Sequence, residues 1–177
     1  MKKIALISWA CLAAAHVMPQ ALYKPVDKAS TVRFKIKNLG FAVSGSFTGL
    51  SGTIQFDPAL LSAAAMDVTV DASTVNTDNS LRDEHLRAET YFDALRFPLI
   101  RLVSEKITAP RRGTYLFSGR LIIKNHTKDI SFPFSVAAID GGYRFQGSFT
   151  LNRRDFEIGG FSTISDQLEV LLNVTAK

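Results

Sequence analysis

The chain has 177 residues, of which 46% are hydrophobic and 21% are charged, and its formal net charge at pH 7 is +5. This length suits one domain with a substantial core. The positive surplus is small and spread along the chain, and runs such as Pro110–Gly113 are too short to follow a nucleic-acid backbone. Nucleic-acid binding is therefore not expected.

The first 21 residues have the features of a cleavable signal peptide. Lys2 and Lys3 precede an apolar run, Ile4–Ala15, which is short for a membrane-spanning helix and typical of a signal-peptide core. Small residues allow cleavage after Ala15 or after Ala21. We therefore expect export to the periplasm, which leaves residues 22–177 as a single domain. The alternative, a buried N-terminal helix, has no obvious packing partner later in the sequence.

The only cysteine, Cys11, lies inside this leader, so the mature chain has no thiol and no disulfide. The residues that precede Cys11 do not favour its lipidation. Loss of the leader also removes two lysines, which leaves 19 Lys and Arg against 16 Asp and Glu and lowers the net charge to +3. Core packing alone must therefore hold the mature protein together.

Alternating apolar and polar residues predict β-strands through most of the mature chain. In Thr31–Asn38, for example, Val32, Phe34 and Ile36 point to one side, and basic residues stand between them. The same alternation recurs at 66–71, 130–136, 143–151 and 168–174, and turn sequences separate these runs. We count about eight or nine strands and one helical segment, which predicts an all-β fold.

Each predicted strand is apolar on one face only. Parallel strands that lie between two layers of helices would be apolar on both faces. A sheet with one dry face either closes into a barrel or stacks on a second sheet. We favour an antiparallel barrel, because closure removes exposed strand edges.

Three glycines fall in register with the apolar faces of their strands: Gly45, Gly119 and Gly147. A glycine at such a position removes side-chain volume, so a hollow interior is one interpretation. The other is that these glycines let the strands bend at barrel corners. The many phenylalanines around them favour a long apolar cavity.

The most highly charged stretch, Asn79–Phe92, predicts a short helix. Ser80 and Asp83 fit a capping box, which places the helix start at Leu81. Asp83 is also spaced to pair with Arg87 four residues later. Such a self-paired helix would lie solvated across the barrel.

The sequence leaves three alternative roles for this helix. The first is a solvated brace, and the second is a catalytic element with His85 as general base. The third is a contact for a polar headgroup, made by Arg82 and His85 at the mouth of a cavity. Catalysis has little support, because no serine lies in a nucleophile elbow and no thiol remains. A metal site has little support either, because His85 and His126 are the only histidines after the leader.

Four segments together resemble a known family. They are residues 23–57, residues 81–100 with their R-D-x-H-L and F-D motifs, the hairpin 119–134, and residues 151–160, which read LNRRDFEIGG. This pattern resembles the YceI-like family of exported, lipocalin-like barrels that bind polyisoprenoids. Two positions depart from the usual pattern: Asn125-His126 occupies a turn that often carries glycine, and Glu157 follows Phe156 where glycine is common. The charge of Glu157 would then alter one end of the cavity.

The resemblance implies an extended antiparallel lipocalin-like barrel of about eight strands with one helix packed across it. It also implies non-catalytic binding, storage or transport of a long-chain polyisoprenoid or related amphiphilic lipid, such as an isoprenoid quinone or prenyl phosphate, in the lumen. No cofactor is expected beyond this non-covalently bound lipid. The residues expected to contact it are Phe34, Phe47, Arg82, His85, Phe92, Phe117, Gly119, Phe132, Phe134, Phe145, Gly147 and Phe149.

Several alternatives remain at this stage. One alternative is an envelope stress or interaction protein with a packed barrel. The other is an enzyme that acts on an isoprenoid lipid with His85 as acid/base. Arg153 and Asp155 are candidates for an ion pair that joins the last hairpin to the helix. Transient contact with a membrane or a membrane protein, homodimerisation, and the choice between carriage, storage and sensing stay open.

Overall fold

A computed structural model describes residues 21–177, so the predicted signal peptide, apart from Ala21, lies outside the described residues. The strands are β1 (Leu22–Tyr23), β2 (Thr31–Asn38), β3 (Phe41–Phe47), β4 (Ser51–Gln55), β5 (Ala65–Asp71), β6 (Leu99–Arg111), β7 (Thr114–Ile123), β8 (His126–Ile139), β9 (Gly142–Asn152) and β10 (Ile164–Ala176). One α-helix, α1 (Ser80–Arg87), and four 3-10 turns, η1 (Asp27–Ala29), η2 (Leu61–Ala63), η3 (Ala72–Thr74) and η4 (Arg153–Phe156), complete the described structure. Within this part of the chain, no helix is long and apolar enough to cross a bilayer.

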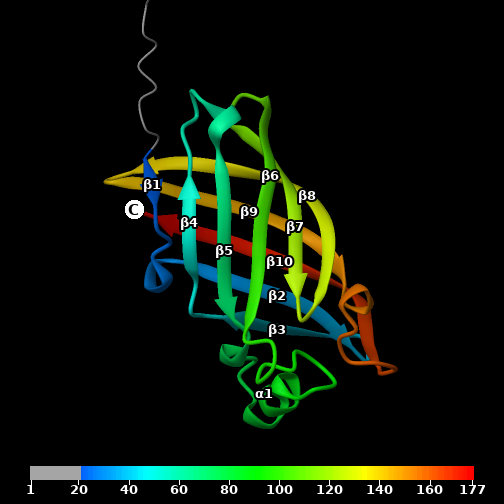
Figure 1. Ribbon diagram of the computed structural model, residues 1–177. Coiled ribbons are helices and arrows are strands. Elements are labelled where there is room, and N and C mark those ends of the chain that lie inside the picture. The colour runs from blue at the N-terminus through cyan, green and yellow to red at the C-terminus, as the bar shows by residue number, and fades with distance from the viewer. Residues whose placement is uncertain (1–20) are drawn as a thin grey trace, which may run out of the picture.

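All ten strands belong to one antiparallel sheet that curls around an apolar interior (Figure 1). Their order is β1-β4-β5-β6-β7-β8-β9-β10-β2-β3, so β4 to β10 follow one another and β2 returns to pair with β10. The predicted all-β, barrel-like fold is confirmed. Ten strands form where about eight were expected, because β1 is too short to show alternation and only three residues separate β3 from β4.

The sheet is closed by contacts at its two edge strands rather than by one continuous ladder. After β1, residues 24–26 run beside the end of β10: the Lys24 amide donates to the Lys177 carbonyl at 2.8 Å, and the Val26 amide donates to the Thr175 carbonyl at 2.8 Å. At the other edge, Ser46 of β3 exchanges backbone hydrogen bonds with Asn76 at 2.9 and 3.0 Å. These short bridges turn the curled sheet into a barrel.

One seam in the wall lacks a backbone ladder. The β8–β9 pairing ends at Phe134 and Gly147, so residues 126–133 of β8 pair with β7 but not with β9. Pro133 lies at this point with its carbonyl on the β9 side, and a proline has no N–H for the next ladder bond. Beyond it, Phe132 stacks on Phe149 across the seam, with ring centroids 4.8 Å apart.

Two of the three in-register glycines serve packing rather than hollowness. A Cβ at Gly45 would collide with the ring of Phe34, so this glycine makes room for that side chain. A Cβ at Gly119 would collide with the Val103 carbonyl, beside an irregularity in the β6–β7 register. For Gly119 the strand-bending interpretation therefore fits. Of the three, Gly147 alone lines the interior cavity, and a Cβ there would also stand close to Phe134 and to the Pro133 carbonyl.

The alternation along the strands is confirmed, because the predicted inward residues are buried or half-buried and the basic residues of β2 are exposed. One end of the interior is filled by aromatic rings. Phe56 is 1% exposed and makes edge contacts with Tyr115, Tyr143 and Phe145 at centroid distances of 5.2, 5.3 and 5.3 Å. Burial raises the pKa of Tyr143, as expected for a phenol that lies among these rings. We call Phe56, Tyr115, Tyr143 and Phe145 the aromatic plug.

Replacement of Phe56 by alanine should lower the free energy of unfolding by about 3–5 kcal/mol, because it leaves a cavity inside the aromatic plug. Denaturant unfolding would measure the change. The matched control is Phe161→Ala, because Phe161 is 98% exposed, and it should change stability by less than about 1 kcal/mol. Equal effects of the two substitutions would contradict this account of the plug.

Candidate ligand-binding cavity

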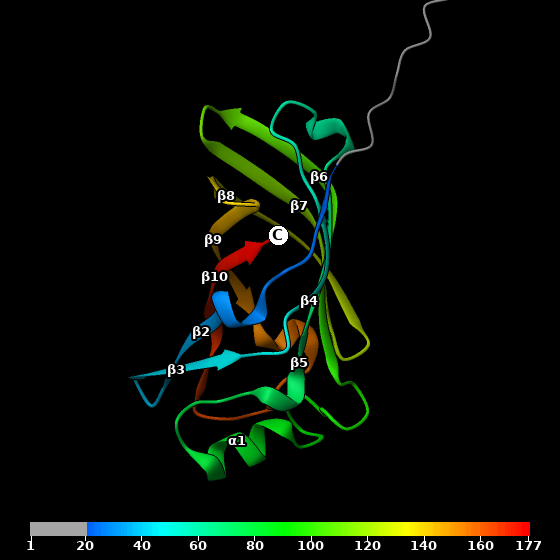
Figure 2. The same cartoon turned by 90° about the vertical axis from the view of Figure 1, so that its left-hand side faces the viewer.

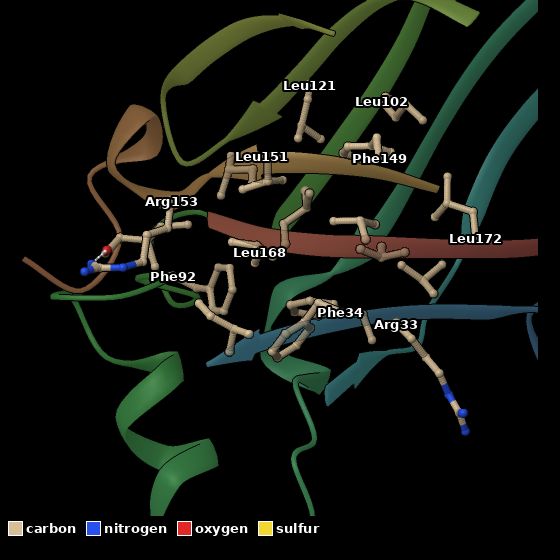
Figure 3. A pocket seen from close by; sticks show the side chains of 18 of the residues that line it. Arg33, Phe34, Phe92, Leu102, Leu121, Phe149, Leu151, Arg153, Leu168 and Leu172 are labelled. Carbon is tan, nitrogen blue, oxygen red and sulfur yellow. Dashed lines mark hydrogen bonds between the residues drawn. The ribbon is translucent and has the colours of Figure 1, made fainter. Parts of the chain in front are cut away.

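The interior between the aromatic plug and α1 contains a cavity of about 460 Å³ (Figure 3). This volume lies within the range of roughly 300–1,000 Å³ that is usual for small-molecule sites. Every strand from β2 to β10 contributes side chains, and nearly all of them are aliphatic or aromatic. The cavity can therefore hold a hydrocarbon chain, but its walls offer few hydrogen-bonding groups to a polar ligand.

Eleven of the twelve predicted contact residues line this cavity. They are Phe34, Phe47, Arg82, His85, Phe92, Phe117, Phe132, Phe134, Phe145, Gly147 and Phe149. Gly119 is not part of the lining, since it stands against the backbone of β6. Sequence analysis missed the branched aliphatic residues that face the same space, among them Leu102, Leu121, Leu151, Leu168, Val170 and Leu172. Their positions follow from the same alternation along the strands that places the phenylalanines inside.

The cavity does not run the full length of the strands. Phe56, Tyr115 and Tyr143 do not line it, whereas Phe145 does, so the aromatic plug forms its floor. The opposite end is bordered by α1 and by residues 91 and 92 (Figure 1). The predicted long cavity is therefore a blind pocket in this structure, with its polar mouth at the α1 end.

The helix at the mouth begins one residue earlier than predicted. Asn79, not Ser80, is the N-cap, and its side chain accepts a hydrogen bond from the Arg82 amide at 2.9 Å. An asparagine side chain satisfies an otherwise unpaired amide of the first helical turn as well as a serine does. The predicted capping box with Ser80 is therefore wrong, although the helix itself is confirmed.

A buried threonine connects α1 to the chain that leads into it. Thr77 is 4% exposed, and its amide and hydroxyl both donate to the Asp83 carboxylate, at 2.8 and 2.5 Å. Arg82 donates from Nε to the same hydroxyl and from Nη2 to the Thr77 carbonyl, each at 2.7 Å. The aspartate is 6% exposed, so these bonds replace the water it loses on burial. Arg82 therefore braces the helix as well as bordering the cavity.

The expected pair between Asp83 and Arg87 does not form. Asp83 faces Thr77, and Arg87 instead donates from Nε to the Ser73 carbonyl at 2.7 Å. The helix is thus tied to the chain on its N-terminal side rather than being self-paired. Spacing of four residues made the pair plausible but could not anticipate the competing partners.

His85 lies on the cavity side of α1 and is exposed. In the part of the chain that the structure describes, its imidazole has no hydrogen-bond partner. Leu81 and Leu86 border the cavity beside it, and Phe92 packs edge-on against Phe47 with centroids 5.3 Å apart. Across residues 21–177, no three His, Cys, Asp or Glu side chains gather closely enough to hold a metal ion.

Arg153 holds together the loop on the other side of the mouth. Its side chain is 3% exposed, and its five N–H groups donate to the carbonyls of Ser165, Ile158, Gly160 and Ile164 and to the Asp166 carboxylate, at 2.6–3.1 Å. The predicted partner Asp155 is wrong, because Asp166 from β10 occupies that place. This arginine therefore orders the backbone between η4 and β10.

The two positions that depart from the family pattern lie close together. His126 Nε2 stands 3.6 Å from Glu157 Oε2, and neither residue lines the cavity. Glu157 adopts a left-handed backbone with φ of 52°, which explains why glycine suits this position. Glu157 is thus not part of the cavity lining, although the next residue, Ile158, is. The side chain of Glu157 is directed to the surface near β8.

A family model for the YceI-like domain matches residues 23–176. The chain belongs to the YceI-like family. A UPF0312 protein of Pseudomonas savastanoi pv. phaseolicola is 32% identical over 146 residues, which cover 78% of this chain and 76% of that protein.

Solved structures share the fold at lower identity. BcnA of Burkholderia cenocepacia superposes with a TM-score of 0.80 at 22% identity, covering 85% of this chain and 98% of that one. A polyisoprenoid-binding domain of Saccharophagus degradans, implicated in plant cell wall breakdown, gives 0.71 at 15% identity and covers 88% of this chain and 97% of that one. At these identities the likeness concerns the fold alone.

Replacement of Arg153 by methionine should lower the free energy of unfolding by about 3–5 kcal/mol, because four carbonyls would lose the arginine as donor and the Asp166 carboxylate would keep only Arg154. Denaturant unfolding would measure this loss. Arg154→Met is the matched control: Arg154 also contacts Asp166, at 3.0 Å, but its side chain is 38% exposed. That control should cost less than about 1 kcal/mol, and a larger loss in it than in Arg153→Met would refute the assigned role.

Proposed function

We propose that this YceI-like protein binds a long-chain isoprenoid or similar amphiphilic lipid without altering it chemically. The observation that carries the proposal is a cavity of about 460 Å³ with nearly all-hydrocarbon walls, closed at one end by aromatic rings and bordered by polar residues at the other. Such a site suits a ligand with an apolar tail and a polar head. The tail would point toward the aromatic plug and the head toward α1.

Burial of the tail supplies the driving force. Each methylene that leaves water contributes about 0.8 kcal/mol in gross transfer free energy. The entropy lost when a flexible chain is ordered offsets a large part of this gain. Polar groups at the mouth, including His85, Arg82 and Asn79, would then favour one orientation and one class of headgroup rather than supply most of the affinity.

The relatives support this class of ligand. The S. degradans domain with the same fold binds polyisoprenoids, and the YceI-like assignment covers residues 23–176 of this chain. The predicted leader would place the protein in the periplasm, where it would carry or store its lipid between the two membranes of the envelope. An isoprenoid quinone or a prenyl phosphate fits the proposed arrangement of tail and head.

The direct test is extraction of the natively purified protein with organic solvent and mass spectrometry of the extract. We expect an apolar lipid at a molar ratio near one. Preparations without such a lipid that also fail to take up added prenyl lipids would overturn the proposal.

A substitution that fills the cavity should abolish lipid uptake while the fold persists. Gly147→Phe is unsuitable, because a Cβ there already stands 3.1 Å from the Phe134 Cβ and from the Pro133 carbonyl. Val170→Trp is better, since Val170 lines the cavity in the middle of β10. We expect the molar ratio of lipid to protein in Val170→Trp to be at most about one tenth of the wild-type ratio.

The matched control for this filling variant is Leu171→Trp, which places the same side chain on the opposite face of β10. Leu171 does not line the cavity. Its variant should hold as much lipid as the wild type, and circular dichroism should show both variants folded. Normal uptake by Val170→Trp would argue against binding inside the barrel.

The competing catalytic use of His85 has its own test. Prolonged incubation with a prenyl lipid should leave the mass of the lipid unchanged, in the wild type and in His85→Ala alike, because no second acid, base or nucleophile is hydrogen-bonded to this histidine within residues 21–177. Mass spectrometry of the lipid is the measurement. A product that forms only when His85 is present would establish the enzymatic alternative.

A further inference from the structure

The Lys and Arg residues of this chain are concentrated near its start relative to the Asp and Glu residues. Residues 28–56 contain Lys28, Arg33, Lys35 and Lys37 and no acidic residue. Without the leader, the rest of the chain has 15 Lys and Arg against 16 Asp and Glu. The net positive charge of the mature protein therefore comes from the first strands. The prediction that the surplus of Lys and Arg is spread along the chain is wrong.

Three of these cations form a stripe on the outer face of β2. Arg33, Lys35 and Lys37 are exposed, and their partners on β3 are Ser46, Ser44 and Ala42. Figure 3 shows Arg33 directed away from the apolar lining. On β10, Glu169 faces Lys35, and the irregular segment opposite Lys37 contains Asp166, which accepts hydrogen bonds from Arg153 and Arg154. No ion pair holds any of the three cations in the described structure. We call Arg33, Lys35 and Lys37 the β2 stripe.

The stripe leads to a hairpin tip that exposes large apolar side chains. Leu39 is 70% exposed and Phe41 is 78% exposed. Leu39 also has a left-handed backbone, with φ of 51°, next to Gly40 with φ of 84°. A leucine in that conformation costs free energy, and its exposed side chain makes little packing contact that would offset the cost. The tip is thus poorly explained by the stability of the fold.

The same end of the barrel exposes further apolar residues. Eight large hydrophobic residues are exposed in the described chain. Besides Leu39 and Phe41, four of them belong to α1, to the connection from α1 into β6, and to the connection between η4 and β10, segments that lie toward the lower part of Figure 1: Leu81, Leu95, Leu99 and Phe161. The connection that carries Phe161 joins the hairpin through the Leu39 amide, which donates to the Thr163 carbonyl at 3.3 Å. Figure 2 shows the β2–β3 hairpin projecting sideways from the barrel, just above the level of α1 in that view.

These residues frame the mouth of the cavity. Ile36, Asn38 and Val43 of the hairpin line it from one side, and Leu81 and His85 of α1 line it from the other. Cations beside exposed apolar side chains are the combination that places a protein at the interface of an anionic bilayer. The surface and the cavity mouth therefore face the same way.

We propose that the α1 end of the barrel docks on an anionic lipid bilayer, with Leu39 and Phe41 at the level of the headgroups and the β2 stripe above them. The inference rests on the proposed function for one point only, namely that the docked mouth receives its ligand from that bilayer. A second copy of the chain fits this end less well. A two-fold contact centred on the β2 stripe would bring identical cations together.

Vesicle flotation tests the docking. Vesicles that contain phosphatidylglycerol should carry the wild-type protein, vesicles of phosphatidylcholine alone should not, and added salt should weaken the association. Lys35→Ser combined with Lys37→Ser should weaken binding at least about tenfold, since each cation near an anionic surface contributes about fivefold. Leu39→Ser combined with Phe41→Ser should weaken it to a similar degree.

Control variants come from the rest of the barrel. Leu60→Ser removes an exposed leucine far from α1, and Lys106→Ser removes an exposed cation from β6; both should bind vesicles within about twofold of the wild type. Failure of the wild type to float with anionic vesicles, or equal binding by the hairpin variants, would overturn the proposal. A dimer that dissociates in the hairpin variants while flotation is unchanged would make a second copy the occupant instead.

Lipid extraction from each variant separates the two proposals. Hairpin variants that retain lipid but lose vesicle binding are the expected result. A wild type that holds no lipid yet floats in a hairpin-dependent manner would defeat the proposed ligand and leave the docking surface intact. A wild type that holds lipid but does not bind anionic vesicles would defeat the docking surface and leave the proposed ligand intact.

Discussion

Burial of one apolar face of a single curled sheet determines the rest of this protein. Residues 21–177 contain no cysteine, and the one α-helix within them has eight residues, so the inner faces of β2 to β10 must supply the core. A curved sheet of this width leaves more space than its own side chains fill. Aromatic rings fill one end, and the other end stays open to about 460 Å³. Core and binding site are thus two halves of the same apolar interior.

The mouth of the cavity is held by buried polar contacts rather than by hydrophobic packing. Thr77, Asp83 and Arg82 fix α1 on one side, and Arg153 fixes the backbone between η4 and β10 on the other. Each buried charge in these clusters is hydrogen-bonded, as burial requires. The contacts that hold this rim do not involve the apolar side chains of the lining, so its shape does not depend on what occupies the interior.

The sequence predicted the strands, the one-sided alternation and the helix, because these depend on local periodicity. It also predicted most of the aromatic residues of the cavity lining, since inward phenylalanines can be read from the alternation, but not the aliphatic ones. Long-range choices were beyond it: Asp166 rather than Asp155 meets Arg153, and Thr77 rather than Arg87 meets Asp83. Gly119 was misplaced for a related reason, because a glycine that relieves a strand contact and one that borders a void look alike in sequence.

The interruption between β8 and β9 gives the barrel one compliant side. Along this seam, stacked rings of Phe132 and Phe149 replace the backbone bonds that join the other strands. Where full ladders join the strands, widening would rupture several hydrogen bonds at once, whereas along this seam only the packing of the rings opposes it. A guest wider than the resting cavity would therefore meet less resistance along this stretch of the circumference than at the full ladders.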